Sequence, residues 1–291
     1  MAELVRIASG VLSAAIDPVG AELSSLRDVE GRELMTDADP AFWTGRAPLL
    51  FPVVGMPSRE TIRVDGVAYP MKKHGFARRS RFAVAEVGAN QARFVLAESE
   101  ETRASYPFAF ELAVGFRIDG PTLAIEATIA NRGDVEMPAS FGFHPAFAWP
   151  LPYGQDRDAH RIIFAADEPD RLKAIAGDGT IAGATRETPL DGRILHLADA
   201  LFEKDALVWD DVRSDHVTYG APAGPRLDIA FPDTSMLGIW TKPGAAYVCV
   251  EPWHGIADPE SYAGEFRDKP GVFIVPVGGE KLIRMSVTLV P

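Results

Sequence analysis

Residues 108–130 read FAFELAVGFRIDGPTLAIEATIA, and this stretch decides the fold class. On both sides of Asp119-Gly120-Pro121, apolar and polar residues alternate at every second position. That is the period of a half-buried β-strand, whereas an amphipathic helix repeats at about 3.6 residues. Aspartate, glycine and proline in succession are typical of a turn. The stretch therefore predicts two antiparallel strands, Phe108 to Ile118 and Thr122 to Ala130.

The same alternation recurs along the chain, punctuated by 26 glycines and 23 prolines. A second hairpin is predicted where Arg81 to Val87 and Ala92 to Ala97 flank Gly88-Ala89-Asn90. Many short strands separated by turns predict an all-β protein, a large antiparallel sandwich or barrel with little helix. The other predicted strands are Ala2 to Ile16 (as a pair), Ala21 to Arg27, Arg161 to Phe164, Ala206 to Trp209, Arg226 to Phe231, Met236 to Trp240, Ala246 to Glu251, Val272 to Val275 and Leu282 to Val290.

Helical periodicity is weak throughout. We expect a helical turn or two near Pro259 to Phe266, and loops at Leu151 to Asp158 and Ala174 to Thr188. No linker separates two regimes of composition, so we expect a single domain over residues 1–291.

Composition excludes several classes of partner. The formal net charge of −12 argues against nucleic acid and against an anionic membrane surface, although a local basic pocket is compatible with it. Cys249 is the single cysteine, so the chain can form no internal disulfide. No stretch approaches the roughly 18 apolar residues of a spanning helix, and Met1 to Gly20 lacks the apolar core of a signal peptide. We therefore expect a soluble, cytoplasmic protein.

A histidine among aromatic residues is the first candidate for chemistry. Residues 141–147 read FGFHPAF, in which Gly142 leaves room for close approach and Pro145 favours an extended backbone at His144. Such a stretch suits an imidazole held rigidly against a small ligand. The alternative interpretation is a turn in the core with one hydrogen-bonded histidine.

Three further stretches combine polar with apolar residues. Trp43 to Gly55 contains Arg46, which is either a binding group or the solvated end of a buried strand. Lys72 to Arg79 places His74-Gly75-Phe76 inside a basic loop. Tyr247 to Asp258 places Glu251 at the end of an apolar strand, followed by proline and tryptophan. A carboxyl enclosed in this way has a raised pKa and suits a general base, unless it forms an ordinary ion pair at the strand end.

Together these stretches predict acid–base chemistry on a polar ligand that is uncharged or carries one negative charge. The six histidines include no pair spaced one or three residues apart, so a metal site would need fully dispersed ligands. The sequence also lacks the serine-nucleophile elbow, the phosphate-binding loop and the dinucleotide fingerprint.

At these four stretches the sequence resembles the aldose 1-epimerase (galactose mutarotase-like) superfamily, and within it the LacX-like branch. The resemblance implies a single large antiparallel β-supersandwich. The matching segments are residues 48–55 (PLLFPVVG), 74–78 (HGFAR), 142–147 (GFHPAF) and 250–253 (VEPW), in order over nearly the whole chain.

The resemblance also implies roles for individual residues. Glu251 falls where the family has its general base and His144 where it has its general acid. His74 matches a second, sugar-binding histidine, and Arg78 matches an arginine that binds hydroxyls or, in the hexose-6-phosphate branch, phosphate. Asp205 corresponds loosely to a family aspartate that holds sugar hydroxyls.

Three other positions bear on substrate choice. Arg46 is a further candidate arginine for the substrate, without a firm register. Related sequences often have glutamine where this chain has Lys73, and arginine where it has Met56, with Arg59 nearby as a substitute. These departures concern the identity of the sugar more than the type of reaction.

The resemblance implies an aldose 1-epimerase that interconverts the α and β anomers of a hexose, an isomerase that needs no cofactor. The expected partner is a small-molecule sugar, an aldohexose or a hexose phosphate. The alternatives are a hexose-6-phosphate 1-epimerase, a sugar-binding protein without catalysis, and a glycoside hydrolase or lyase. Hydrolysis needs a second carboxylate facing Glu251, for which Asp205 and Asp258 are the candidates.

Overall fold

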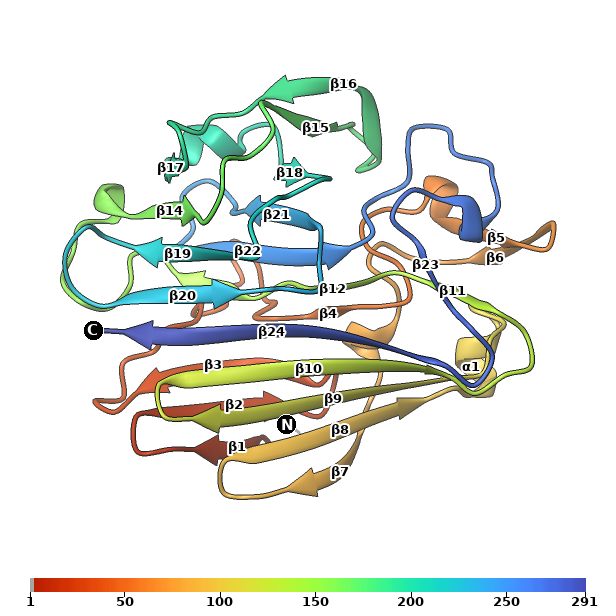
Figure 1. Ribbon diagram of the computed structural model, residues 1–291, viewed down its shortest axis with the longest axis horizontal. Helices are drawn as coiled ribbons and strands as arrows, with labels where there is room; N and C mark the ends of the chain where they lie inside the picture. Colours follow the sequence, from red (N-terminus) through yellow and green to blue (C-terminus); the bar gives the residue numbers. More distant parts are fainter. Residues whose placement is uncertain (1–2) are drawn as a thin grey trace.

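The computed structural model describes residues 3–291, and most of its regular structure is β-strand (Figure 1). Strands account for 47% and helices for 7% of the chain, so the expected all-β fold with little helix is confirmed. The predicted hairpins are confirmed too, with observed strands within two residues of the expected bounds. Of the predicted pair of strands from Ala2 to Ile16, Ala2 lies outside the described residues.

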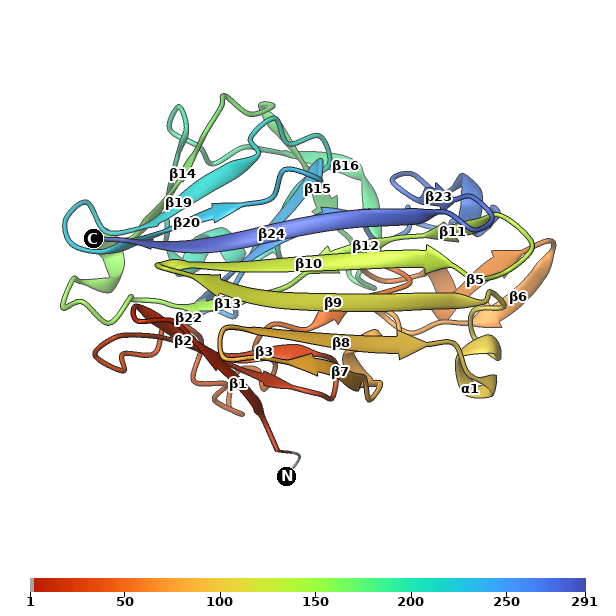
Figure 2. The same cartoon turned by 60° about the horizontal axis from the view of Figure 1, so that its bottom comes forward.

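The larger of the two main sheets has nine antiparallel strands. Its long strands β24, β10, β9 and β8 run side by side across the molecule in both views (Figures 1 and 2). In spatial order the sheet contains β17 (Ile194–His196), β14 (Arg161–Phe164), β19 (His216–Gly220), β20 (Arg226–Ala230), β24 (Glu280–Val290), β10 (Thr122–Asn131), β9 (Phe110–Asp119), β8 (Gln91–Ala97) and β7 (Ala83–Val87).

The second main sheet carries the candidate site. In spatial order it contains β16 (Ile181–Glu187), β15 (Arg171–Ile175), β18 (Leu207–Trp209), β21 (Met236–Trp240), β22 (Tyr247–His254), β12 (Phe141–Phe143) and β4 (Leu49–Leu50), and β13 (Ala146–Ala148) also pairs with β22. Inner-face side chains of both main sheets, such as Ile125 of β10 and Val250 of β22, belong to one continuous core cluster. The two sheets therefore form the layers of a sandwich.

Smaller elements surround this sandwich. They are the sheet β1 (Val5–Ala8), β2 (Leu12–Asp17) and β3 (Glu22–Asp28), the hairpin β5 (Thr61–Val64) and β6 (Val67–Pro70), the pair β11 (Met137–Ala139) and β23 (Phe273–Val275), the helix α1 (Glu100–Arg103), and 3-10 turns at Ser58–Glu60, Ala77–Arg79, Arg157–Ala159, Asp199–Phe202 and Phe266–Asp268. Within residues 3–291, no helix has the length and apolar character needed to cross a membrane.

Two expectations about local structure were wrong. The helical turn expected near Pro259 to Phe266 is absent from the described chain there, and a 3-10 turn begins only at Phe266. The short helix α1 forms elsewhere in the chain. It begins directly after Ser99, which makes a capping box with Thr102. Residues 174–188, expected to be a loop, contain the whole of β16, because pairing with β15 overrides the low strand propensity of a glycine-containing segment.

Candidate active site

Alternation along β22 sends successive side chains to opposite faces of the eight-stranded sheet. Val248 and Val250 belong to the main core, whereas Cys249 belongs to a separate cluster on the other face. Glu251 has the same parity as Cys249, so it also points away from the main core. Although it lies on the face opposite the main core, Glu251 is only 2% exposed, because side chains from neighbouring strands and loops enclose it.

His144 meets Glu251 across neighbouring segments of this sheet. It lies between β12 and β13, both of which pair with β22. The Nε2 atom of His144 lies 3.1 Å from Oε2 of Glu251, and both side chains are buried. A hydrogen bond between an imidazole nitrogen and a carboxyl oxygen needs one proton between them. The two groups are therefore close enough to share a proton when the ring and the carboxyl are aligned.

Burial controls the charge of this pair. It raises the pKa of Glu251 well above the ordinary 4.5, and the charge of Lys73 partly offsets that rise. Burial also lowers the pKa of His144 to about 3, and the cations Arg78 and Lys73 add to that shift. Both shifts favour the uncharged forms, so within the pair the proton favours the carboxyl. Hydrogen-bond donors to Glu251 stabilise its carboxylate and so move the proton toward His144.

A second histidine is fixed by two hydrogen bonds to Gly55. The amide of His74 donates to the carbonyl oxygen of Gly55 at 2.9 Å, and the amide of Gly55 donates to Nδ1 of His74 at 3.1 Å. Burial, followed by the nearby His144, lowers the pKa of His74 well below 6.5, so the ring is neutral. Because Nδ1 is an acceptor, the single proton lies on Nε2. His74 is therefore a fixed N–H donor.

The backbone at position 75 explains why a glycine follows this histidine. Its φ is +71°, and an added Cβ would lie 2.1 Å from the carbonyl oxygen of Phe51. The same oxygen accepts hydrogen bonds from the amides of Phe76 and Ala77. Only glycine fits both the left-handed backbone and this close approach. The turn thereby holds His74 against the segment that follows β4.

Two glycines make room for an indole beside the carboxyl. An added Cβ on Gly142 of β12 would lie 2.5 Å from Trp253, and one on Gly238 of β21 would lie 2.4 Å from it. Gly238 is also the cross-strand partner of Glu251. Trp253 thus lies across two neighbouring strands, close enough to Glu251 to lower its pKa somewhat. The room expected at Gly142 is confirmed, and Trp253 fills it.

These groups border a cavity of about 290 Å³. The structure brings five of the six predicted site residues to it: His74, Arg78, His144, Asp205 and Glu251. Its remaining lining residues are Trp43, Gly55, Lys73, Ile175, Gly179, Ile181, Ala206, Val208, Trp240, Trp253 and Ala257. A small cavity with apolar walls and a few converging polar groups is typical of a site for a small molecule.

Sequence reasoning missed two tryptophans of this cavity. Trp43 lies beside His144, with ring centroids 5.0 Å apart, and packs edge-on against Trp240 at 5.6 Å. Phe143 and Phe147, the aromatic residues that flank His144 in the sequence, belong to the main core and do not line this cavity. Trp240 is the last residue of a predicted strand. Its size and its place at a strand end were the only features of the sequence that could have marked it as a cavity residue.

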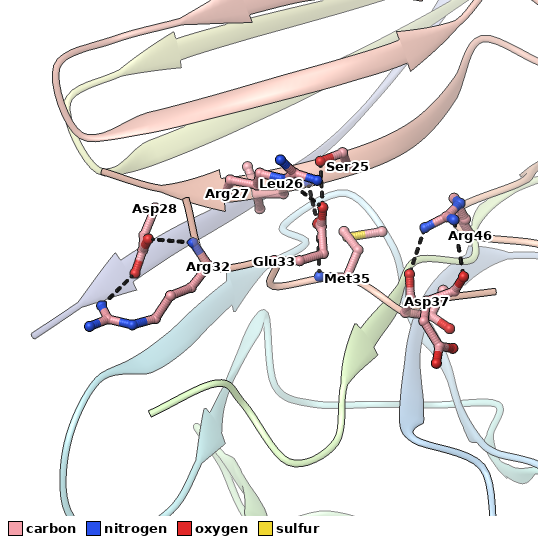
Figure 3. Close-up of polar contacts among 10 residues, drawn as sticks. Ser25, Leu26, Arg27, Asp28, Arg32, Glu33, Met35, Asp37 and Arg46 are labelled. Carbon is pink, nitrogen blue, oxygen red and sulfur yellow. Dashed lines mark hydrogen bonds and ion pairs between the residues drawn. The ribbon is translucent and has the colours of Figure 1, made fainter. Parts of the chain in front are cut away.

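Arg46 does not reach the cavity. Its guanidinium donates to the carbonyl oxygens of Thr36 at 2.6 Å and Asp37 at 3.1 Å, and Figure 3 shows the side chain directed at Asp37. Arg46 therefore anchors the chain near residues 36–37 and is not a substrate arginine. Arg59 lies on a 3-10 turn beside another cavity, so it does not stand in for the arginine missing at Met56.

A second buried carboxyl lies close by in the sequence but has another environment. Oδ1 of Asp258 lies 2.8 Å from Nζ of Lys269, and both side chains are almost fully buried. The amide of Ser58 donates to the other carboxyl oxygen at 2.8 Å. Asp258 is absent from the cavity lining, although its neighbour Ala257 is part of it. Of the two spare carboxylates proposed for hydrolysis, the structure therefore brings only Asp205 to Glu251.

One dispersed set of residues has the right atoms for a metal. Among the described residues, His144, Cys249 and Glu251 place their potential ligand atoms within 4.8 Å of one another. A metal bound there would have to separate His144 and Glu251, which now lie 3.1 Å apart. Burial also raises the pKa of the Cys249 thiol, which disfavours the thiolate that metals bind. The pair is better suited to moving protons.

The fold is that of the galactose mutarotase-like class, an antiparallel sandwich, here with a buried histidine and glutamate beside a cavity on one sheet. The family model for aldose 1-epimerase matches residues 3–218. The chain belongs to the aldose 1-epimerase family, and within it to the LacX-like branch. The matched segment contains His74, Arg78, His144 and Asp205, and Glu251 lies beyond it.

Relatives cover nearly the full chain. It is 28% identical over 283 residues to the chromosomal protein LacX of Lactococcus lactis subsp. lactis, spanning 92% of this chain and 93% of that protein. The X-ray structure of a galactose mutarotase related enzyme from Lactobacillus acidophilus has a TM-score of 0.91 at 28% identity, covering 99% of this chain and 98% of that one. A galactose mutarotase-like protein from Lactobacillus casei has a TM-score of 0.92 at 26% identity, covering 99% and 100%. These likenesses support a carbohydrate epimerase type of function.

Proposed function

We propose that this protein is an aldose 1-epimerase that interconverts the α and β anomers of a hexose. The observation that carries the proposal is the contact of 3.1 Å between Nε2 of His144 and Oε2 of Glu251 beside the cavity. Anomer exchange needs one group that removes the proton of the anomeric hydroxyl and another that protonates the ring oxygen. A pair that shares one proton can supply both functions.

In the proposed reaction, Glu251 accepts the proton of the anomeric hydroxyl while His144 donates a proton to the ring oxygen. The bond between C1 and the ring oxygen breaks, and the ring opens to the aldehyde. Rotation about the bond between C1 and C2 turns the other face of the carbonyl to the ring hydroxyl. Closure forms the new bond between C1 and oxygen, and both protons return. No electrons are transferred, and the sugar leaves with its original composition.

Substrate binding prepares the pair for this step. Burial alone favours the proton on Glu251, whereas the reaction starts with the carboxylate and the imidazolium. Hydroxyl groups that donate to Glu251 stabilise its carboxylate and shift the proton to His144 without changing the total charge of the pair. The positioned acid and base would each accelerate exchange by roughly 10²–10⁴-fold.

The remaining cavity groups orient the sugar. The Nε2–H of His74 is a donor for an oxygen near the ring oxygen, and Asp205 accepts from sugar hydroxyls. Asp205 reaches the cavity with a left-handed backbone at φ 67° and a carboxylate oxygen that accepts from the next amide at 2.7 Å. Trp43 and Trp253 supply apolar walls for the C–H surface of the sugar.

Polarimetry or saturation-transfer NMR tests this function directly. Freshly dissolved α-glucose and α-galactose should reach anomeric equilibrium faster with the wild type than with buffer alone. Glu251→Gln should return the rate to that of buffer while the protein stays folded. Sugar binding measured by calorimetry without faster exchange would instead identify a sugar-binding protein and contradict the proposed catalysis.

A further inference from the structure

The general acid of the proposed reaction lacks a hydrogen bond at its second ring nitrogen. Nε2 of His144 lies 3.1 Å from Oε2 of Glu251. Nδ1 is buried, and no other residue in the described part of the chain forms a hydrogen bond with it. The tautomer and orientation of a functional imidazole are usually set by the hydrogen bond of its second nitrogen. Another kind of contact therefore has to orient the ring of His144.

Aromatic rings surround His144 instead. The ring of Trp43 lies against it, with centroids 5.0 Å apart and planes inclined at 34°. Two rings lying side by side in one plane could not approach so closely, so these rings are stacked with an offset. Trp240 and His74 make T-shaped contacts with His144, at 6.1 Å and 5.8 Å. Of these three neighbours, Trp43 is the one that stacks on the imidazole.

The indole of Trp43 is itself held in place by its surroundings. Its ring packs edge-on against Trp240 at 5.6 Å and lies 5.7 Å from the ring of Tyr247. Arg46 anchors the same segment of chain through the carbonyl oxygens of residues 36–37. Arg46 thus contributes to the cavity indirectly, because the segment that it anchors presents Trp43 to His144.

The reaction needs the charged form of His144, which most of its environment opposes. Burial lowers the pKa of His144 to about 3, and the cations Arg78 and Lys73 add to that shift. The neighbouring groups that titrate or carry charge are Glu251 and Cys249 on β22, Lys73, His74 and Arg78 on the turn, and Asp205 in the cavity wall. Apart from the two carboxyl groups, none of these favours an imidazolium, because His74 and the thiol are neutral.

We propose that Trp43 is a positioning residue for the general acid, whose stacked indole orients His144 and stabilises its imidazolium form. The inference rests on the proposed epimerase function and adds a residue to it. The face of an indole is electron-rich and attracts a cation that lies within about 6 Å of the ring centroid. The separation of 5.0 Å meets that condition. The contact therefore favours the starting state of the reaction, in which His144 carries the proton, over the state with the proton on Glu251.

Two variants of Trp43 separate the aromatic face from simple packing. Phenylalanine keeps a smaller ring, whereas leucine fills comparable space without one. Both leave room for water beside His144, so the difference between them reports the ring itself. At saturating glucose or galactose, kcat measured by saturation-transfer NMR should fall from wild type to Trp43→Phe and further to Trp43→Leu. The total loss in Trp43→Leu should be roughly 10- to 30-fold.

Phe42→Leu is the matched control. It removes a neighbouring aromatic ring that packs against the same cluster as Trp43, but Phe42 does not line the cavity. It should leave kcat close to the wild-type value. Trp43 is half-buried and lies outside the main core, so all three variants should fold, which circular dichroism checks.

The pH profile of kcat distinguishes stabilisation of charge from a structural role. The pair carries two protons on the acid side of the profile, and that form contains the imidazolium. Loss of the aromatic face destabilises it, so the acid limb of Trp43→Leu should lie below that of Trp43→Phe, by up to about one pH unit. A residue that only filled space would lower kcat without moving this limb.

The outcomes separate this inference from the function on which it rests. Equal kcat in Trp43→Phe and Trp43→Leu, or acid limbs that coincide, would contradict the role of the indole, while exchange by the wild type would leave the epimerase function standing. If the wild type exchanges neither sugar faster than buffer does, the epimerase function is contradicted and this inference with it.

Discussion

Glu251 and Asp258 are two carboxyl groups, seven residues apart, that are buried almost equally at 2% and 4% exposure. Asp258 faces the ammonium of Lys269 at 2.8 Å and also accepts the amide of Ser58. Glu251 faces a neutral imidazole at 3.1 Å. Burial is therefore common to both groups, and their partners differ.

That difference makes Asp258 a structural group and Glu251 a candidate for chemistry. A lysine and a backbone amide both contact the carboxyl of Asp258, so the group is held in a fixed ion pair. The imidazole partner of Glu251 can give or take a proton, and burial raises the pKa of Glu251 well above 4.5. A buried carboxyl with a raised pKa in a cavity is a candidate for acid–base work, whereas a satisfied ion pair is not.

The largest expected effect is on catalysis at Glu251. Glu251→Gln should lower kcat for anomer exchange by roughly 10²–10⁴-fold, because the amide cannot accept the anomeric proton. Asp258→Asn, the matched control, should keep kcat within the same order of magnitude in the folded protein, since Asp258 lies outside the cavity lining. Equal losses of kcat in the two variants would break the contrast between these carboxyls.

The reverse order is expected for stability. Asp258→Asn leaves the buried ammonium of Lys269 without its counter-charge and should destabilise the protein by about 3–5 kcal/mol in urea unfolding. Combining it with Lys269→Met removes both charges, and most of the lost stability should return. A double variant as unstable as the sum of the single variants would show that the two groups do not act as a pair.

A smaller effect is expected where Trp253 packs beside Glu251. Gly238→Ala places a Cβ 2.4 Å from the indole and should cost about 1–3 kcal/mol of stability through overpacking. It should also lower kcat, because the indole has to move away from Glu251. Gly183→Ala on β16 is the control, since no atom lies within 4 Å of its added Cβ. Unchanged kcat in Gly238→Ala would show that the indole does not position the carboxyl.

The smallest expected effect is a gain of stability in Glu251→Gln. The pKa of Glu251 is raised by folding, so the folded state binds more protons than the unfolded state above pH 4.5. The wild type consequently loses stability as pH rises through that range, and glutamine removes this loss. We expect Glu251→Gln to exceed the wild type by about 0.5–2 kcal/mol at neutral pH, with a smaller difference near pH 4.5. Equal stabilities at all pH values would contradict the raised pKa.

Much of the fold could be predicted because its signals are local. The hairpins around Gly120 and Ala89 follow from period-2 alternation and turn residues that adjoin them. The strand β16 could not be predicted, because it contains Gly183 and depends on its pairing with β15. Whether the chain forms one domain stays a prediction.

The candidate site shows the same contrast between residues with a local sequence signal and residues whose role depends on the fold. Glu251 and His144 could be singled out because a polar group inside an apolar stretch is visible in the sequence itself. Arg46 could not be placed correctly, since its partners are main-chain oxygens of Thr36 and Asp37 that only the fold brings near. Trp240 was missed because an aromatic residue at a strand end reads the same in a core as in a cavity.

The most direct test of the shared-proton pair is the pH profile of kcat for wild-type anomer exchange. Activity requires one proton on the pair, so it should fall in acid when His144 and Glu251 are both protonated and in alkali when neither is. The pKa of His144 is lowered to about 3 and that of Glu251 is raised. We therefore predict a broad plateau through neutral pH, with an acid limb well below the ordinary imidazole value of 6.5. A profile that stays flat into strong acid and alkali would contradict the account.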